Sequence, residues 1–529
     1  MKNFLSFLFL FLCVQMHAED LHLNFYFSSD MVLQAGKPIP VKGYAKPGKT
    51  VTVRFRGTTV KTKAGTDGQF RALLPAMDYQ NEGAELTVRQ GNELVTLSNV
   101  TVGDVWLCSG QSNMEMMVGE VRNNYPNEVK HDAGVRILSL KPSRKVYHVP
   151  YSAGMRDSVA SFRYWADTKW GGATDDKVIN PSSAVAYFFA QRLREDVHHN
   201  IGLVQTPVGG TPLEAFVDSA TLQRVVPEYL QNDYMHNDLV QDWVRHRAIK
   251  NCESASDKQS HPHPFKPGYQ YCVGVRPLCD FPIKGIIWYQ GESNANQIAV
   301  YELLFPALVD SWRKAWNDDT LPFYTVQISS IERELWPDFR NTQRILSYTI
   351  PHSGLAVSSD CGHRSDVHPK QKKPVGERLA RLALHRTYGF DIEDQGPTFV
   401  RFEPSSSLIN EQQRKALGAN TIFEAQRAVH PDLTAVAIFS HAKGLTTSDG
   451  EAPSTFEVAG ADGIYHPARA IIASLPTATA TYSSSVEAGV VLLFCPEVQH
   501  PLHVRYGWKS FSEGNLINGE GLPCSTFQY

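Results

Sequence analysis

The stretch that decides the fold is Gly103-Asp104-Val105-Trp106-Leu107-Cys108-Ser109-Gly110-Gln111-Ser112-Asn113-Met114. Its apolar run suits a buried parallel strand, and the run ends in glycine and small polar residues. A second segment has the same design: Lys284-Gly285-Ile286-Ile287-Trp288-Tyr289-Gln290-Gly291-Glu292-Ser293-Asn294-Ala295. Because parallel sheets bind ligands at the carboxyl ends of their strands, we expect both polar tails to meet at one edge of a sheet.

Strands alternate with helical stretches from residue 103 to about 390. A helical pattern over 184–193, for example, precedes a strand pattern over 201–205. Further helices are predicted over 301–316 and 374–383, with a strand over 322–328 between them. Such alternation predicts an α/β fold of three α/β/α layers, in which a mostly parallel sheet carries helices on both faces.

The flanking parts of the chain have β patterns. Short alternating runs separated by Pro-Gly, Asp-Gly and Gly-Asn turns precede residue 102, and strand patterns return after Pro397. We therefore predict a leader at 1–18, a β-sandwich at 19–102, a catalytic domain at 103–390 and a β-rich module at 391–529.

The net charge and the first residues of the chain indicate which partners to expect and where the protein is located. A formal net charge of −3 in 529 residues offers no basic field for nucleic acid. The apolar run from Phe4 to Val14 follows a lysine and ends near the small residue Ala18, which is the pattern of a secretory signal peptide. The run is too short to span a membrane. We therefore expect a secreted, periplasmic or cell-surface protein without a membrane span.

The cysteines and histidines predict neither a disulfide framework nor a metal site. Removing the leader leaves seven cysteines of the eight, an odd number without Cys-x-x-Cys pairs. One bridge among Cys252, Cys272 and Cys279 and a set of free thiols are both open alternatives. His261-Pro262-His263 has no accompanying carboxylate motif, so we interpret it as a solvated loop and expect no metal or other cofactor.

Ester hydrolysis needs a nucleophile and a base, and the chain offers candidates for both. Ser112 follows the first strand, and Ser293 holds a similar place after the second, so the pattern alone leaves both open as nucleophile. His368, in Asp366-Val367-His368-Pro369, is the candidate base. Asp366 is the candidate acid that orients the imidazole, and a dyad assisted by a backbone carbonyl is the alternative.

The negative oxygen of a tetrahedral intermediate also needs N–H donors. The backbone N–H groups of Ser112 and of Gly210, in Val208-Gly209-Gly210-Thr211, are candidates for this oxyanion hole. Gln290 is the candidate third donor, because an amide attracts negative charge that the neighbouring Glu292 would repel.

Four ordered blocks together resemble the sialate O-acetylesterase family of SGNH hydrolases. They are Cys108 to Met114, Gly209-Gly210-Thr211-Pro212, Trp288 to Ala295, and Asp366 to Pro369. The segments 27–34, 504–508 and 514–516 are also similar, so the resemblance covers nearly the whole mature chain. It implies that Ser112 is the nucleophile. In the wider class the third donor is an asparagine and the acid lies three residues before the histidine, whereas this chain has Gln290 and a spacing of two.

The resemblance implies a sialate O-acetylesterase that removes acetyl groups from sialic acids through an acetyl-enzyme, which water then cleaves. An anionic sugar favours a nearby cation, and Arg340 is the candidate. An acetylesterase acting on acetylated xylan or another glycan is the alternative with the same chemistry. A glycan-binding protein without catalysis, using loop aromatics such as Trp165 and Trp170, is the alternative of another class.

Overall fold

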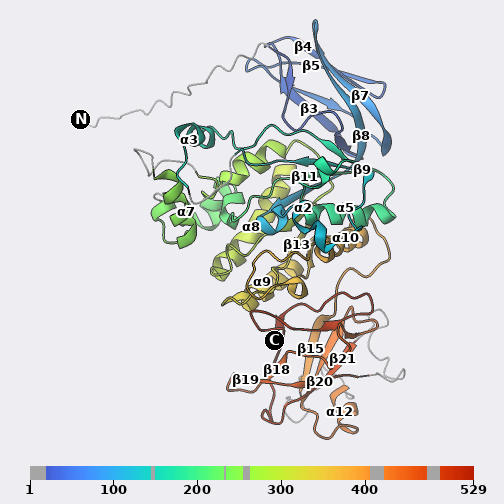
Figure 1. Ribbon diagram of the computed structural model, residues 1–529, viewed down its shortest axis with the longest axis vertical. Coiled ribbons are helices and arrows are strands. Elements are labelled where there is room, and N and C mark those ends of the chain that lie inside the picture. The colour runs from blue at the N-terminus through green and yellow to red at the C-terminus, as the bar shows by residue number, and fades with distance from the viewer. Residues whose placement is uncertain (1–19, 144–148, 232–233, 254–262, 405–421, 474–488) are drawn as a thin grey trace, which may run out of the picture.

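The computed structural model describes residues 20–143, 149–231, 234–253, 263–404, 422–473 and 489–529 (Figure 1). Sheets from the first hundred residues form one end of the molecule, a mixed α/β body forms the middle, and further sheets form the other end. The predicted α/β class with β-rich parts on both sides is confirmed. The predicted leader, residues 1–18, lies outside the described residues.

The central sheet is organised around β8 (Glu93–Gly110). The last part of β8 pairs in parallel with β11 (Ile201–Gln205) on one side and with β12 (Gly285–Tyr289) on the other. The order across the sheet is β10-β9-β11-β8-β12-β13-β14, with β10 antiparallel to β9. The remaining strands of this path are β9 (Asp132–Ser139), β10 (Gly171–Ala173), β13 (Phe323–Val326) and β14 (Ser353–Ala356). The chain adds strands first on one side of β8 and then on the other, so β8 lies at the switch point where α/β sheets bind ligands.

The first part of β8 belongs to the N-terminal sheets, where it pairs antiparallel with β7 and parallel with β2. A three-stranded sheet, β1-β3-β6, contributes to the same buried cluster of side chains. The strands are β1 (His22–Leu23), β2 (Val32–Gln34), β3 (Ile39–Tyr44), β4 (Thr50–Phe55), β5 (Thr58–Lys63), β6 (Gln69–Leu74) and β7 (Gln80–Gln90). Because β8 runs on through residues 102 and 103, it connects the sheets to the α/β body; the domain boundary there stays a prediction.

Helices cover both faces of the central sheet, because successive side chains of a strand point to opposite faces. Leu107 and Ile286 belong to a core shared with α6, α8 and α9, whereas Trp106 and Ile287 belong to a core shared with α5 and α10. The helices of the body are α1 (Ser112–Glu115), α2 (Val118–Val121), α3 (Ala153–Ala160), α4 (Asp176–Ile179), α5 (Ala184–Asp196), α6 (Ser219–Val225), α7 (Asp242–Cys252), α8 (Ile298–Trp316), α9 (Trp336–Thr349) and α10 (Lys373–Arg386).

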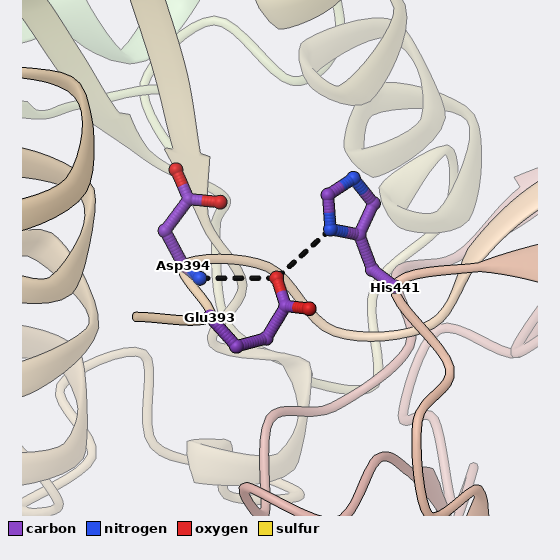
Figure 2. A group of neighbouring side chains, drawn as sticks. All are labelled: Glu393, Asp394 and His441. Carbon is purple, nitrogen blue, oxygen red and sulfur yellow. Dashed lines mark hydrogen bonds and ion pairs between the residues drawn. The ribbon is translucent and has the colours of Figure 1, made fainter. Parts of the chain in front are cut away.

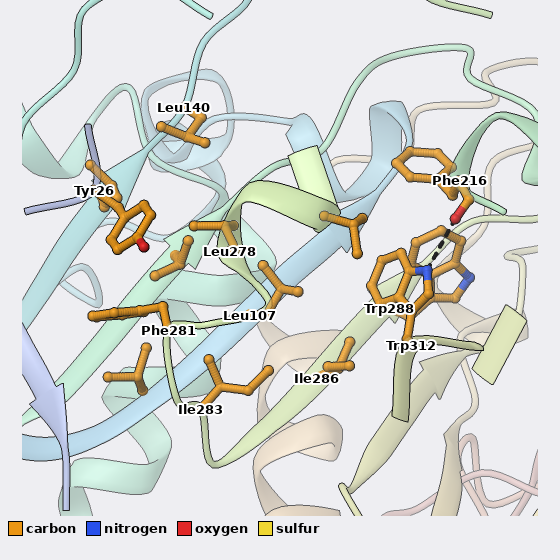
Figure 3. Packing of buried hydrophobic residues seen from close by; sticks show 14 of the residues in the cluster. Tyr26, Leu107, Leu140, Phe216, Leu278, Phe281, Ile283, Ile286, Trp288 and Trp312 are labelled. Atoms are coloured by element: carbon orange, nitrogen blue, oxygen red, sulfur yellow. Dashed lines mark hydrogen bonds between the residues drawn. The ribbon is translucent and has the colours of Figure 1, made fainter. Parts of the chain in front are cut away.

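Two tryptophans anchor the first of these cores. Trp288 of β12 and Trp312 of α8 pack edge to face with ring centroids 5.6 Å apart, and the Trp312 indole N–H donates to the carbonyl of Phe216 at 3.0 Å (Figure 3). Truncating a fully buried tryptophan to alanine typically costs about 3–5 kcal/mol of stability. This packing fixes the strand that precedes the second motif.

The C-terminal part forms two four-stranded sheets, β15-β16-β21-β20 and β19-β18-β22-β24, beside a short pair, β17 and β23. Its elements are β15 (Thr398–Pro404), α12 (Ile422–Arg427), β16 (Ala435–Ser440), β17 (Thr446–Thr447), β18 (Phe456–Ala459), β19 (Tyr465–Pro467), β20 (Arg469–Ala473), β21 (Gly489–Phe494), β22 (His503–Tyr506), β23 (Leu516–Ile517) and β24 (Phe527–Gln528). The two larger sheets share one apolar core, as a β-sandwich does.

Two findings bear on the predicted location and thiol chemistry. No helix in the described ranges combines the length and the apolar composition that crossing a membrane requires. Each of the seven cysteines after Cys13 is a free thiol. Of the two alternatives, the structure therefore has free thiols, and no bridge, at Cys252, Cys272 and Cys279.

Candidate active site

Ser112 is the first residue of α1, which begins two residues after β8 ends. The turn between them requires glycine at position 110: its φ is +134°, and a Cβ there would lie 2.1 Å from the Tyr289 carbonyl oxygen. The sharp turn brings the Ser112 side chain to the carboxyl edge of the sheet. Its backbone N–H opens the helix and has no acceptor among the described residues.

The imidazole of His368 contacts this serine. Its Nε2 lies 2.8 Å from the Ser112 Oγ, although the two residues are 256 positions apart in the sequence. The rival, Ser293, donates its hydroxyl to the Gly210 carbonyl at 3.1 Å and is almost fully buried. The structure therefore brings the predicted base to Ser112, and Ser293 hydrogen-bonds to backbone.

Asp366 holds the turn before the imidazole. One of its carboxylate oxygens accepts the backbone N–H of His368 at 2.8 Å, whereas the same oxygen lies 4.0 Å from the ring Nδ1. A separation of 4.0 Å is beyond hydrogen-bond range. In this arrangement Asp366 fixes the backbone of His368 and interacts with the ring only through its charge.

Asn113 links three of the predicted motifs. Its side-chain N–H group donates to Glu292 at 2.5 Å and to the Val367 carbonyl at 2.9 Å, and its oxygen accepts from the Lys372 ammonium at 2.5 Å. Lysine only donates and a carbonyl only accepts, so these partners fix the orientation of the amide. The network holds the residue just before His368 against the residue just after Ser112.

The two charged members of this network are strongly affected by their surroundings. Lys372 is fully buried, and burial lowers the pKa of its ammonium to about 8, against the opposing charge of Glu292. Burial raises the pKa of Glu292, while Asn113 and Lys372 act in the other direction. The Lys372 ammonium also lies 5.4 Å from the centre of the Tyr289 ring. The Lys372 ammonium and the Glu292 carboxylate therefore compensate each other for the free-energy cost of burying a charge, together with Asn113.

We expect Lys372→Met to lower kcat by roughly 10–100-fold, because the segment that carries His368 loses its fixed position and small displacements of catalytic groups are costly. Leaving Asn113 and Glu292 without the ammonium should also lower the free energy of unfolding by about 1–3 kcal/mol. Steady-state kinetics on an acetyl ester and urea unfolding measure the two effects.

The matched control is Lys373→Met, which removes the neighbouring ammonium. Lys373 pairs with Glu128 and Glu377 on the surface, and such exposed pairs contribute at most about 1 kcal/mol. Equal kcat values for the two variants would contradict the role of Lys372.

The pH dependence of activity follows from the surroundings of His368. Burial lowers the pKa of the imidazole below its usual 6.5; Lys372 and Lys370 act in the same direction and Asp366 opposes them. Only the neutral ring accepts the serine proton, so activity is kept above the lowered pKa and lost as the pH falls through it. We expect kcat/KM for p-nitrophenyl acetate to have an acid limb with its midpoint below about 6.5. A midpoint above neutrality would contradict this.

A glycine pair after β11 lies beside the nucleophile. Gly209 donates its N–H to the Glu115 carboxylate of α1 at 2.8 Å, and a Cβ on Gly209 would lie 3.6 Å from the Cβ of Ser112. Gly210 has a φ of +75°, which favours glycine. Its N–H, like that of Ser112, has no acceptor within the described ranges. Glu115 thus holds in place a turn that offers an uncommitted backbone donor next to the serine.

Gln290 differs from the expectation. Its side chain is fully buried, and its N–H group donates to the Asn294 side chain at 2.7 Å and to the Thr211 carbonyl at 3.4 Å. The Gln290 N–H group therefore already has acceptors within the protein, and the amide supports the loop after β12. Gln111, the neighbour of Ser112, makes the other connection to this loop by accepting from the N–H groups of Gly291 and Ser293 at 3.3 Å.

The three other side chains predicted to contact a sugar, those of Arg340, Trp170 and Trp165, all donate to backbone carbonyls of the protein. Arg340 is fully buried in α9 and donates to the backbone carbonyls of Gly507 and Ser510, so it anchors the C-terminal sheets and does not bind substrate. Trp170 is also buried, with its N–H on the Tyr26 carbonyl at 2.8 Å. Trp165 is half-buried, and its N–H donates to the Val273 carbonyl at 2.8 Å.

His263 is another difference. The prediction of a solvated loop is wrong for this residue, which is fully buried, bonds to Asn251 at 3.0 Å and accepts the Phe265 N–H at 3.0 Å. Burial lowers the pKa of its imidazole to about 3, so the ring is neutral. His261 and Pro262 lie outside the described residues.

Glu393, Asp394 and His441 are close enough to share a cation, but other partners explain their arrangement (Figure 2). One Glu393 oxygen accepts from the His441 ring at 2.8 Å and from the Asp394 backbone N–H at 3.1 Å. Asp394 pairs with Arg386 of α10 at 2.5 Å. These bonds connect the end of α10 to the C-terminal sheets.

A polar cavity of about 680 Å³ lies apart from Ser112. Asn200, which precedes β11, lines it together with Asp30 and Asn99, so the cavity opens at the amino edge of the central sheet and next to the N-terminal sheets. Arg136, in its wall, donates to the carbonyl and side chain of Asn99. Two further pairs of its polar residues, Asn99 with Asp30 and Asn200 with Asn81, also bond to each other, and Ser112 lies at the opposite edge of the sheet.

Sequence reasoning missed three residues that position the site: Asn113, Glu115 and Lys372. The signal for Asn113 was its place inside the first motif, and the signal for Lys372 was a lysine four residues after the candidate base. The sequence does not show which residues Asn113 and Lys372 bond to, because these hydrogen-bond partners lie in separate motifs.

A serine hydroxyl bonded to an imidazole, at the carboxyl edge of a mostly parallel sheet between helical layers, is the arrangement found in α/β serine esterases. A family model described as carbohydrate esterase, sialic acid-specific acetylesterase matches residues 102–242 and 270–385. The chain belongs to this family of carbohydrate esterases.

Known relatives are similar over most of the chain. The sialate O-acetylesterase of Homo sapiens is 28% identical over 424 residues, covering 72% of this chain and 73% of that protein. The sialate O-acetylesterase of Mus musculus is 26% identical over 437 residues, covering 73% and 77%. The crystal structure of a carbohydrate acetylesterase from Xanthomonas citri is 28% identical, with a TM-score of 0.70 over 96% of this chain and 99% of that one.

Proposed function

We propose that this protein is a sialate O-acetylesterase that removes O-acetyl groups by a serine nucleophile in an SGNH-type catalytic domain. The observation that carries the proposal is the 2.8 Å contact between the Ser112 Oγ and the His368 Nε2. Membership of the carbohydrate esterase family and the similarity to sialate O-acetylesterases support the choice of substrate.

In the proposed reaction His368 accepts the Ser112 proton as the hydroxyl oxygen attacks the acetyl carbonyl. The N–H groups of Ser112 and Gly210 stabilise the negative oxygen that forms. The imidazolium then gives its proton to the departing sugar oxygen, which leaves an acetyl ester on Ser112. Water then attacks the acetyl carbon while His368 accepts its proton. The bond to the Ser112 Oγ breaks, acetate leaves, and the imidazolium returns the proton to the serine oxygen.

The buried position of Arg340 favours a second candidate, an esterase for acetylated xylan or another neutral glycan. Arg340 is the cation that the sequence predicts for a sialic acid carboxylate, but its guanidinium binds backbone carbonyls of the C-terminal part. A neutral sugar needs no such cation. The catalytic residues and the acetyl chemistry are the same for both candidates.

Acetate release from defined substrates tests the proposal. Wild-type protein is incubated with O-acetylated N-acetylneuraminic acid, acetylated xylo-oligosaccharides and p-nitrophenyl acetate, and acetate is quantified. Preference for the sialic acid supports the first candidate, and preference for the xylo-oligosaccharide supports the second. If no sugar substrate releases acetate, the assignment as a carbohydrate esterase is wrong and a binding role takes its place.

We also propose that the chain is exported, on the basis of the apolar run from Phe4 to Val14. The segment lies outside the described residues, and the proposal depends on its sequence pattern alone.

A further inference from the structure

An exposed tryptophan forms one wall beside the candidate oxyanion donor. Trp243, the second residue of α7, is 37% exposed. A Cβ placed on Gly210 would lie 3.5 Å from the six-membered ring of its indole. Gly210 in turn follows Gly209, which neighbours Ser112. The glycine pair therefore separates the indole from the nucleophile, with Gly209 next to Ser112 and Gly210 next to Trp243.

Several contacts hold this indole in one place. Its N–H donates to the Gln241 side chain at 3.0 Å, and Gln241 also donates to the Ser293 carbonyl in the loop after β12. The fully buried ring of Phe265 packs against it at an angle of 69°, with centroids 5.7 Å apart. A ring fixed before binding loses little conformational freedom when a ligand contacts it.

Phe265 is itself held in place by a buried neighbour. The buried His263 ring packs edge to face on Phe265 with centroids 5.1 Å apart and bonds to Asn251 of the same helix, α7. His263 therefore connects Phe265 to α7, the helix that carries the Trp243 indole. Residues 243–269 fall between the two stretches that the family model matches, so this wall is not part of what that model describes.

We propose that Trp243 is the platform on which the sugar ring of the acetylated substrate stacks, an inference that rests on the proposed function. A pyranose that carries its acetyl group at Ser112 and extends over Gly210 reaches Phe265 and Trp243, and of these two rings only the indole is exposed. The C–H face of a pyranose is apolar, and the faces of aromatic rings bind such groups. The platform selects a ring-shaped alcohol portion without regard to its charge.

The prediction is that Trp243→Ala lowers kcat/KM for the acetylated sugar about tenfold or more, mainly through KM, because the stack is lost in ground and transition states alike. Hydrolysis of p-nitrophenyl acetate, which carries no sugar, should change by less than about twofold. Trp243→Phe keeps an aromatic face and should retain most activity on the sugar.

The matched control is Ile249→Ala, which shortens another apolar side chain of α7 that is also 37% exposed. This variant should change kcat/KM for neither substrate. Thermal unfolding of each variant checks the fold. Equal losses on the sugar and on p-nitrophenyl acetate for both Trp243 variants, or an unchanged KM for the sugar, would overturn the platform. Failure of the proposed function is distinct, since wild-type protein would then release no acetate from any sugar.

Discussion

Ser112→Ala is expected to lower kcat by about 10⁴-fold or more, with the fold retained. The variant removes the oxygen that attacks the acetyl carbon in the first step of the proposed reaction. The side chain is small and half-buried, so its loss leaves no sizeable cavity, and the melting temperature should change little. Acetate release from p-nitrophenyl acetate and from the preferred sugar measures the loss.

The matched control is Ser293→Ala. That hydroxyl is buried and its contact is the Gly210 carbonyl, so its removal should cost one hydrogen bond, about 1 kcal/mol, and a loss of activity no greater than about tenfold. The reverse pattern, with Ser112→Ala active and Ser293→Ala inactive, would exchange the roles of the two serines. Labelling by a serine-directed phosphonate, followed by mass spectrometry, gives the same answer without relying on rates.

The fold was largely predictable because it follows from the spacing of apolar residues. The strand pattern over 322–328 corresponds to β13 (Phe323–Val326), and the helical pattern over 374–383 corresponds to α10 (Lys373–Arg386). What the pattern could not show is that β8 continues from the N-terminal sheets into the central sheet as one strand of 18 residues. Alternation of side chains indicates that a strand exists, but not which neighbours it pairs with along its length.

The candidate site was predictable only at the level of backbone position. Residues at the carboxyl ends of parallel strands share an edge, and this is why Ser112, Gly210 and the loop after β12 lie together. Side-chain direction depends on local packing that a spacing does not specify. Gln290 and Arg340 illustrate this, since both point into the protein, where the Gln290 N–H group donates to Asn294 and the Arg340 guanidinium donates to backbone carbonyls.

The same argument explains why the sequence does not single out Trp243, although it offers Trp165 and Trp170 as loop aromatics. An aromatic residue in a polar segment is compatible with either a buried or an exposed position. Trp170 packs beside Phe281 in the core, and exposure beside Gly210 depends on where α7 lies relative to the sheet. That placement is a property of tertiary structure.

His368→Ala is expected to lower kcat by about 10⁴-fold, close to the loss from Ser112→Ala, because a serine hydroxyl is a weak nucleophile without its base. The double variant should lose no more than either single variant, since the two residues act as one unit. Kinetics of the three variants on p-nitrophenyl acetate test this, and additive losses would contradict a shared step.

Asp366 then decides whether the site works as a triad or as a dyad, and two substitutions separate its possible roles. Asp366→Asn keeps an oxygen that can accept the His368 backbone N–H at 2.8 Å but removes the charge, whereas Asp366→Ala removes both. With the carboxylate 4.0 Å from the ring Nδ1, we expect the asparagine variant to retain kcat within about tenfold. The alanine variant should lose more, because the turn that aims the imidazole is released. A fall of about 10⁴-fold for the asparagine variant, as in triads that depend on their acid, would instead show that the carboxylate closes onto the ring during catalysis.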